Sequence, residues 1–429
     1  MSSIRLGCIA DDFTGATDLA NNLVRAGMRV VQTVGVPTEA LSESADAVVV
    51  SLKSRTIAPN QAVAQSLAAL DWLKQHKAEQ IYFKYCSTFD STEQGNIGPV
   101  IDALMDTLDT DFTVATPAFP DAGRTVYRGY LFVGDVLLNE SGMQDHPLTP
   151  MRDPNLVRVL KPQTRHAVGL VDYRATGCDE QAVRERVAAL RQEGVGVAVV
   201  DVLNNEDLLR IGRACAELPL VTAGSGLAIG LPANFGIKPN DTASVLPDPA
   251  GQQAIVSGSC SRATQSQVAA FIESGGQAIA LDPMALSQDP DKLDSYIQEA
   301  VAALGAKPIL VYSTTTPEQL AQIQASLGAM AAGELVEQWL ARVACALLQA
   351  GVGQLVVAGG ETSGAVVQAL GIEQLRIGGQ IDPGVPWCHA MANPTPNDGG
   401  HSIPLHISLK SGNFGGVDFF TRAFDVLAS

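Results

Sequence analysis

The fold class is decided by residues 4–36, which read IRLGCIADDFTGATDLANNLVRAGMRVVQTVGV. Residues 4–10 are a short apolar run that stops at Asp11 and Asp12, and this predicts a buried strand. Apolar residues then recur at helical spacing until a glycine, and residues 29–36 predict a second strand. A strand, a helix and a strand in this order indicate a parallel sheet.

The same alternation continues along the chain. Further strands are predicted at residues 47–51, 80–84, 167–171, 197–201, 220–223, 254–256, 355–358 and 405–409, and helices at residues 61–74, 97–108, 180–192, 264–273 and 363–370. The stretch VLPDPAGQQ, residues 245–253, interrupts the pattern and is rich in proline, glycine and polar residues. We therefore predict an α/β protein with two domains, residues 1–245 and 254–429, joined by a linker at 246–253. Each domain is expected to hold a mostly parallel sheet flanked by helices, with the active site in the cleft between the domains.

Charge, apolar stretches and cysteine content exclude several classes of partner and location. The 429 residues carry a formal net charge of −17 and contain no run of Lys or Arg, so nucleic acid and anionic membrane surfaces are not expected partners. No stretch reaches the ~18 apolar residues of a membrane helix, and the start of the chain is a poor signal peptide. The seven cysteines are odd in number and form no CxxC pair, which is typical of reduced thiols in a cytoplasmic protein.

The strongest local motif is ADDFTGATD, residues 10–18, at the end of the first strand. Ligands bind at this edge of an open parallel sheet, and the following helix N-terminus favours an anionic or hydroxyl-rich ligand. Asp12, or else Asp11, is the candidate catalytic base, and Thr14 is a candidate substrate ligand. The alternative interpretation is simple helix capping. An aspartyl phosphatase is disfavoured because the second Asp falls one position too early for DxDxT.

A second polar cluster is FKYCSTFDSTEQGNIG, residues 83–98, which follows another strand. Its candidate ligands for a polyol carboxylate are Lys84 for the carboxylate and Ser87, Thr88 and Asp90 for the hydroxyl groups. Arg55, after the strand at 47–51, is a second candidate for binding a carboxylate with two parallel hydrogen bonds. Either segment is also compatible with an ordinary surface loop.

The second half carries three small-residue loops that suit a nucleotide. They are VSGSCSRAT (256–264), VVAGGETSGAVV (356–367) and LKSGNFGG (409–416). Backbone N–H groups and hydroxyls in such loops bind phosphates where a helix begins. The candidate residues are Ser257, Ser259, Gly359, Gly360, Glu361, Thr362, Ser363, Lys410 and Gly412. A capped turn or a surface hairpin would also explain these loops.

Several motifs are missing from the sequence. No HExxH, no GxxxxGK[ST] and no GxGxxG occurs, the nearest glycine pattern at 224–230 being one residue too long. A tightly held transition metal and a dinucleotide are therefore not expected.

The motifs ADDFTGATD, KYCSTFDST, GNIG, AGGETSG and LKSGNFG occur in an order that resembles the four-carbon acid sugar kinase family. The resemblance spans almost the whole chain. It implies an N-terminal domain that binds an acid sugar and a C-terminal domain that binds ATP, with Mg²⁺ accompanying the nucleotide. It further implies phosphorylation at O4 of a 3-oxo-tetronate such as 3-dehydroerythronate. By the same resemblance, Asp11, Asp12, Arg55, Lys84 and residues 87–90 belong to the substrate side, and Ser259, residues 360–363 and Gly412 to the nucleotide side.

Some choices stay open in the sequence. The acid could instead be a non-oxidised tetronate (erythronate or threonate), and its D or L configuration is not specified. A non-catalytic sugar-acid-binding protein and a Rossmann dehydrogenase are rival classes. Whether the chain forms a homo-oligomer is also open. Residues 392–401, ANPTPNDGGH, resemble an insertion relative to the family.

Overall fold

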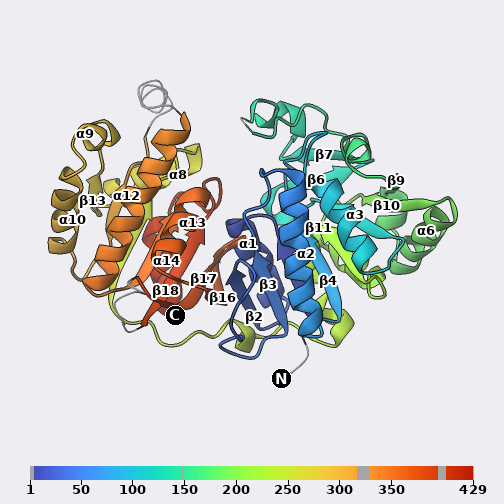
Figure 1. Ribbon diagram of the computed structural model, residues 1–429, viewed down its shortest axis with the longest axis horizontal. Coiled ribbons are helices and arrows are strands. Elements are labelled where there is room, and N and C mark those ends of the chain that lie inside the picture. The colour runs from blue at the N-terminus through green and yellow to red at the C-terminus, as the bar shows by residue number, and fades with distance from the viewer. Residues whose placement is uncertain (1–3, 147, 316–328, 395–401, 429) are drawn as a thin grey trace. The chain divides into compact units, whose positions relative to one another are not determined.

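The computed structural model describes residues 4–146, 148–315, 329–394 and 402–428. The chain divides into two compact units, Met1–Ser244 and Val245–Ser429, called here the N-terminal and C-terminal units. Figure 1 shows both as α/β structures, in which helices flank a sheet.

The N-terminal unit is built on a parallel sheet with the strand order β2–β3–β1–β4–β11–β5–β10–β9. Its strands are β1 (Leu6–Ala10), β2 (Val30–Val34), β3 (Ala47–Ser51), β4 (Gln80–Lys84), β5 (Thr113–Thr116), β9 (Ala167–Val171), β10 (Val195–Val200) and β11 (Leu220–Ala223). A separate antiparallel sheet contains β6 (Arg124–Tyr127), β7 (Tyr130–Val133) and β8 (Val136–Leu137). The central strand β1 is buried at every position, as expected where helices cover both faces of a parallel sheet.

Helices connect these strands. They are α1 (Phe13–Arg25), α2 (Pro59–Gln75), α3 (Ile97–Thr107), α4 (Leu156–Leu160), α5 (Tyr173–Thr176), α6 (Glu180–Gln192) and α7 (Asn205–Ala214). Figure 1 shows α2 and α3 side by side over the strands, in agreement with their mutual contacts. The predicted strand–helix alternation and parallel sheet are confirmed in this unit.

The strand register positions the polar motifs. Ala10 of β1 lies opposite Ser51 of β3 and opposite Lys84 of β4. Because all three strands run in the same direction, the residues that follow each of them emerge at one edge of the sheet.

The C-terminal unit has the strand order β13–β14–β12–β15–β18–β17–β16. Its strands are β12 (Gln252–Ser257), β13 (Gln277–Ala280), β14 (Ile309–Tyr312), β15 (Val352–Ala358), β16 (Gln374–Asp382), β17 (Val385–Ala392) and β18 (Ile403–Lys410). The first five in this order are parallel, whereas β17 is antiparallel to both β16 and β18. The sheet is therefore mostly parallel as predicted, with an antiparallel edge that the sequence analysis did not identify.

Helices also flank this sheet: α8 (Arg262–Glu273), α9 (Pro283–Gln288), α10 (Lys292–Ala302), α12 (Ala329–Gln349), α13 (Gly360–Ala369) and α14 (Phe419–Ala428). Aromatic packing holds α14 in place, because Phe419, Phe420 and Phe424 share a buried cluster with Trp387 of β17. The indole N–H of Trp387 donates to the Ala423 carbonyl at 2.8 Å, so this buried polar group is satisfied.

Two expectations from the sequence, the insertion at residues 392–401 and the lack of a membrane helix, can be compared only with the residues that the structure describes. Of the residues 392–401 that resemble an insertion, Ala392 ends β17, and residues 395–401 lie outside the described residues. Within the ranges that the structure describes, no helix combines the length and the apolar character needed to cross a membrane.

Candidate active site

Charged residues gather at the carboxyl edge of the N-terminal sheet. Asp11 and Asp12 follow β1, Arg55 follows β3, and Lys84 is the last residue of β4. The register of the strands brings together these four residues, which the sequence predicted as one substrate site.

Arg55 and Asp11 form a bidentate ion pair. The guanidinium Nε donates to Asp11 Oδ2 at 3.0 Å, and one terminal nitrogen donates to Oδ1 at 2.9 Å. Both Asp11 oxygens are therefore engaged, and its backbone carbonyl accepts from the N–H groups of Ser54 and Arg55. This pair fixes the guanidinium 3.5 Å from Asp12 and 3.7 Å from Asp90. Because its fork is filled by Asp11, Arg55 is less suited than predicted to clasp a ligand carboxylate with both nitrogens.

Asp12 is the carboxylate that remains accessible. It caps α1 by accepting from the Gly15 N–H at 3.2 Å, and its side chain is 24% exposed compared with 8% for Asp11. Burial alone would raise the pKa of the Asp12 carboxyl, but the charges of Arg55 and Lys84 and the hydrogen bonds from Gly15 and Thr14 outweigh it and lower that pKa. Asp12 is thus ionised at neutral pH and can accept a hydrogen bond from a hydroxyl group.

Lys84 is a buried cation. The residue is only 3% exposed, and its ammonium makes no hydrogen bond or ion pair with the described residues, although its charge interacts with the carboxylates of Asp12 and Asp18. Gly15 makes room for it, since a Cβ atom at Gly15 would lie 2.6 Å from Lys84 Nζ and 3.4 Å from Asp12 Oδ2. A buried ammonium is costly unless it meets an acceptor, so this position favours an anionic ligand.

The loop after β4 carries the predicted hydroxyl ligands. Thr88 donates to Asp90 at 2.7 Å, and both Phe89 and Asp90 adopt positive φ angles, 65° and 39°. Thr14, on α1, donates to Asp12 at 3.3 Å. Ser87 is buried in the same loop. Non-glycine residues in this backbone region are strained, and such strain is concentrated at functional sites.

One amide side chain joins two loops of this site. Asn96 Nδ2 lies within hydrogen-bond distance of three carbonyls, those of Ser54 at 2.7 Å, Ile57 at 2.9 Å and Arg55 at 3.2 Å. Asn96 therefore holds the segment that carries Arg55 against the loop that follows β4. It stands in the quoted polar stretch, but sequence spacing gave no sign of this positioning contact.

Asp18 is a second buried carboxyl on α1. The residue is 4% exposed, and Oδ1 has no hydrogen-bond partner among the described residues. Burial raises its pKa to about 6, although the charge of Lys84 opposes this rise. It closes the ADDFTGATD motif, where the sequence analysis assigned it no role.

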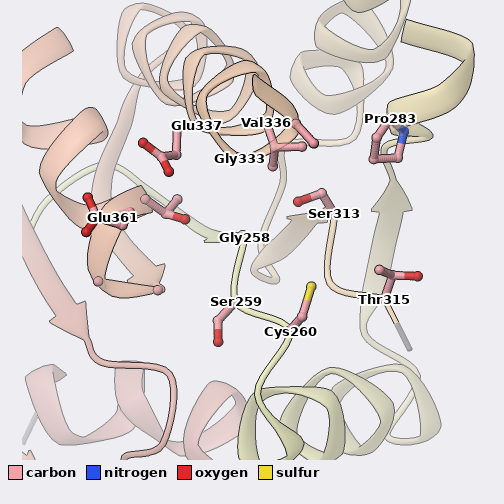
Figure 2. A pocket seen from close by; sticks show the side chains of 14 residues that line it. Gly258, Ser259, Cys260, Pro283, Ser313, Thr315, Gly333, Val336, Glu337 and Glu361 are labelled. Carbon is pink, nitrogen blue, oxygen red and sulfur yellow. The ribbon is translucent and has the colours of Figure 1, made fainter. Parts of the chain in front are cut away.

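The C-terminal unit contains a cavity of about 270 Å³ at the carboxyl edge of its sheet. It is lined by Gly258, Ser259, Cys260, Pro283, Ser313, Thr315, Ala332, Gly333, Val336, Glu337, Gly359, Gly360, Glu361 and Thr362. Figure 2 shows this site, with Ser259 and Cys260 on the loop after β12 and Glu337 on the helix α12. Lining by strand ends and helix starts is the usual setting of a nucleotide site in an α/β sheet.

Two glycines shape the loops that line this cavity. Gly359 has φ 126°, a conformation open to glycine alone, and it caps α13 without any side-chain cap. The first N–H groups of an α-helix have no acceptor within the helix, and the residues that begin α13, Gly360, Glu361 and Thr362, line the cavity. A Cβ atom at Gly258 would lie 2.3 Å from Thr362 Oγ1, so glycine is also required for the close approach of the two loops. Amides at a helix N-terminus bind phosphate oxygens.

The charged groups of the cavity are carboxylates. Glu337 and Glu361 are among its lining residues, on the same side of the view in Figure 2, and no Lys or Arg belongs to the described lining. Polyphosphate bound here would need its charge balanced by backbone amides and by a cation. One or two carboxylates together with phosphate oxygens are the usual ligands of Mg²⁺, so the lining fits that ion. No group of three or more His, Cys, Asp or Glu capable of holding a metal occurs in the described ranges.

The predicted nucleotide residues fall into two groups. Ser259, Gly359, Gly360, Glu361 and Thr362 line the cavity. Ser257, Ser363, Lys410 and Gly412 do not, and the first three of these are fully buried. Ser257 bonds Thr314 at 2.8 Å, and a Cβ atom at Gly412 would lie 2.5 Å from Ser259 Oγ. Direct nucleotide contacts by these four residues stay predictions, and their positions favour a supporting role.

Sequence reasoning missed part of the lining. Ser313 and Thr315 follow β14 in the stretch YSTTT, so the strand-end rule applied to the other loops could have found them. Glu337 had no such signal, because it lies inside the long helix α12 and reaches the cavity only through the packing of that helix.

Each half of the chain matches a known protein-family model. A model described as a sugar-binding N-terminal domain matches residues 6–231, and one described as a nucleotide-binding C-terminal domain matches residues 254–420. The chain belongs to the four-carbon acid sugar kinase family, as its motifs suggested.

Individual relatives cover the chain almost completely. A protein of Cupriavidus necator named 3-oxo-tetronate kinase is 55% identical over 97% of this chain and 96% of its own length. One of Burkholderia multivorans with the same name is 54% identical, over 98% and 97%.

Solved structures agree with the fold. A Salmonella typhimurium LT2 protein, described provisionally as a tRNA synthase, has a TM-score of 0.86 at 43% identity, covering 97% of this chain and 98% of its own. A Haemophilus influenzae protein has a TM-score of 0.79 at 44% identity, covering 98% and 100%.

The buried Asp18 predicts a pH dependence of stability. Between pH 3.8 and about 6 the folded protein holds a proton on Asp18 that the unfolded chain releases, so this residue makes stability fall as pH rises through that window. Asp18→Asn removes the cost of ionising a buried carboxyl, because asparagine carries no charge at any pH. We expect the free energy of unfolding of the variant, relative to wild type, to increase from pH 4 to 6 by roughly 3 kcal/mol and then stay constant.

Urea unfolding at a series of pH values measures this difference. Asp71→Asn, on the exposed face of α2, is the matched control and should follow the wild-type curve. Parallel curves for Asp18→Asn and wild type would contradict the assignment.

Proposed function

We propose that this chain is an ATP-dependent kinase that phosphorylates O4 of a 3-oxo-tetronate, giving the 4-phosphate and ADP. Its family and the names of its relatives support the reaction class. The observation that carries the site assignment is the buried ammonium of Lys84 beside the ionised carboxylate of Asp12. An acid sugar needs both, a cation for its carboxylate and an acceptor for its reacting hydroxyl.

Lys84 is the proposed ligand of the substrate carboxylate. The protein as a whole repels anions, since its net charge is −17, so a local cation must offset that field. Lys84 meets this need, because burial strengthens its attraction for an anion. The hydroxyls of Ser87, Thr88 and Thr14 and the carboxylate of Asp90 are proposed to bind the polyol part.

Asp12 is the proposed general base. Phosphoryl transfer requires mainly that the attacking hydroxyl is aligned and its proton accepted as the bond to phosphorus forms. Asp12 stays ionised at neutral pH and is more exposed than Asp11. Asp11 is proposed to act through Arg55, which it holds in place beside Asp12.

ATP is proposed to bind in the cavity of the C-terminal unit, with its phosphates on the amides that begin α13 and on the loop of Ser259. Mg²⁺, held by the phosphates and by Glu337 or Glu361, would neutralise charge that builds up on the phosphates. Transfer requires the acid and the γ-phosphate to meet. An active site between the two domains would allow this, and it stays a prediction.

A cytoplasmic location is also proposed, since all seven cysteines are free of disulfide bonds. The oligomeric state stays open.

The test of the function is ADP release by the purified protein with Mg²⁺ and ATP. Both configurations of 3-oxo-tetronate are compared with erythronate and threonate, and each assay is repeated with Asp12→Asn. We expect turnover on an oxo acid that falls by about 10² to 10⁴ in kcat in the variant, because a general base contributes that much. The KM for the acid should change far less.

Other results of that assay lead to different conclusions. Turnover on erythronate or threonate alone would replace the oxo acid by the reduced acid. Turnover that persists in Asp12→Asn would show that another residue is the general base, and Asp11 would be the next candidate. No ADP release with any acid, from a protein that still binds ATP, would contradict the kinase assignment.

Gly15→Ala separates substrate binding from stability. Gly15 lies within α1, where alanine is favoured by up to about 1 kcal/mol, but the added methyl group would displace the Lys84 ammonium. We expect an unchanged or higher melting temperature and a KM for the acid that rises by about tenfold or more. An unchanged KM for the acid would rule out Lys84 as its carboxylate ligand.

Glu337→Gln and Glu361→Gln test the cation site. Each removes one charge from the cavity lining while keeping the size of the side chain. We expect the Mg²⁺ concentration for half-maximal activity to rise several-fold in at least one variant, measured at saturating ATP. Glu334→Gln, on an exposed position of α12, is the control and should behave like wild type. Identical Mg²⁺ dependence in all four proteins would exclude both carboxylates.

A further inference from the structure

The loop after β18, residues 411–416, turns its carbonyl groups towards buried donors. Gln267 of α8 places Nε2 at 3.0 Å from the carbonyls of Phe414, Gly415 and Gly416. Within the loop, the Phe414 N–H donates to the Ser411 carbonyl at 3.1 Å. Peptide groups in an irregular segment need such partners when they are buried.

Lys410 supplies the charged donor of this arrangement. The residue is 0% exposed, and its Nζ lies 3.1 Å from Thr264 Oγ1 and from the Ser411 carbonyl, and 3.2 Å from the carbonyls of Gly412 and Phe414. The ammonium thus sits in a cage of four neutral oxygens. Asp382, whose charge favours the ammonium, has its own partners in Arg422 and the Gly416 N–H.

The cage adjoins the nucleotide cavity. A Cβ atom at Gly412 would lie 2.5 Å from Ser259 Oγ, and Ser259 lines the cavity. The Gly412 carbonyl also accepts from Ser261 and Thr264, at the start of α8. On the other side, the N–H of Gly359 donates to the Lys410 carbonyl at 2.8 Å. The loop and the residue before it therefore contact both segments that line the cavity here, the one around Ser259 and the one around Gly359.

Burying the Lys410 ammonium in this space has a cost in free energy. Burial lowers the pKa of Lys410 to about 7, so the surroundings oppose its charge. An apolar side chain of similar length would avoid that cost if filling the space were the only requirement. What methionine could not do is donate hydrogen bonds to loop carbonyls and so fix the conformation of the loop.

We propose that Lys410 is a positioning residue for nucleotide binding, whose ammonium orders the loop 411–416 against Ser259. This inference rests on the proposed ATP site. It differs from the direct nucleotide contact predicted for Lys410, because the ammonium is already surrounded by protein oxygens.

Chemical rescue of Lys410→Ala tests the proposal. The variant leaves a cavity lined by the four oxygens, which a small ammonium ion can enter. We expect the KM for ATP, and the Kd for Mg-ADP measured by calorimetry, to rise by about tenfold or more, while the KM for the acid sugar changes little. Added methylammonium or ammonium chloride should restore most of the affinity, and sodium chloride at the same ionic strength should not.

Lys410→Met separates positioning from packing. Its side chain fills the space without donating a hydrogen bond, so it should lose affinity as Lys410→Ala does but show no rescue by amines. Ser266→Ala, on the exposed side of α8, is the control and should match wild type. If Lys410→Ala does not fold, Thr264→Val removes one oxygen of the cage and should weaken Mg-ADP binding in the same direction.

Two results would overturn the proposal. One is wild-type Mg-ADP affinity in Lys410→Ala or Lys410→Met. The other is a loss of affinity that no amine restores in Lys410→Ala although the protein is folded. The calorimetric readout needs no acid substrate, so a failure of the proposed phosphorylation reaction would be seen separately, as absent ADP release by wild type that binds Mg-ADP normally.

Discussion

The parallel register of β1 with its two neighbours is the constraint on which the N-terminal site depends. Ala10 pairs with Ser51 on one side and with Lys84 on the other, so the three strands end at the same level. Two aspartates, an arginine and a lysine from segments up to 73 residues apart in sequence are thereby collected at one edge. A shift of one residue in either pairing would turn the side chains to the opposite face and separate the charges.

The two candidate sites differ in the charge of the groups that surround them. In the N-terminal unit, Arg55 is neutralised by Asp11, whereas the buried Lys84 makes no ion pair with the described residues and can attract an anionic ligand. In the C-terminal unit, the described cavity lining includes two carboxylates, and the nearby Lys410 is enclosed by three loop carbonyls and the Thr264 hydroxyl. An acid sugar with one carboxylate suits the first arrangement. A polyphosphate that arrives with its own cation suits the second.

The sequence predicted the architecture, for a physical reason, and it also predicted which loops carry the two candidate sites. Strand ends and helix starts are visible as local patterns, and parallel strands must gather them at one edge, so ADDFTGATD and AGGETSG could be placed without coordinates. Pairing choices could not be predicted. That Asp11 rather than Asp12 accepts both hydrogen bonds of Arg55, and that Lys410 faces its own loop rather than the cavity, depends on side-chain direction and burial. Glu337 was missed because helix packing, and no local pattern, brings it to the cavity.

In each unit, one amide side chain bonds several carbonyls of a functional loop. Asn96 meets three carbonyls of residues 54–57 in one unit, and Gln267 meets three carbonyls of residues 414–416 in the other. Loops without regular structure leave their carbonyls unpaired, and a buried donor satisfies several at once while fixing the conformation. Residues of this kind need no contact with a ligand to matter, since a misplacement of about 1 Å at a reacting group can cost about a hundredfold in rate. The geometry of each site therefore depends as much on these buried donors as on the groups that would contact substrate.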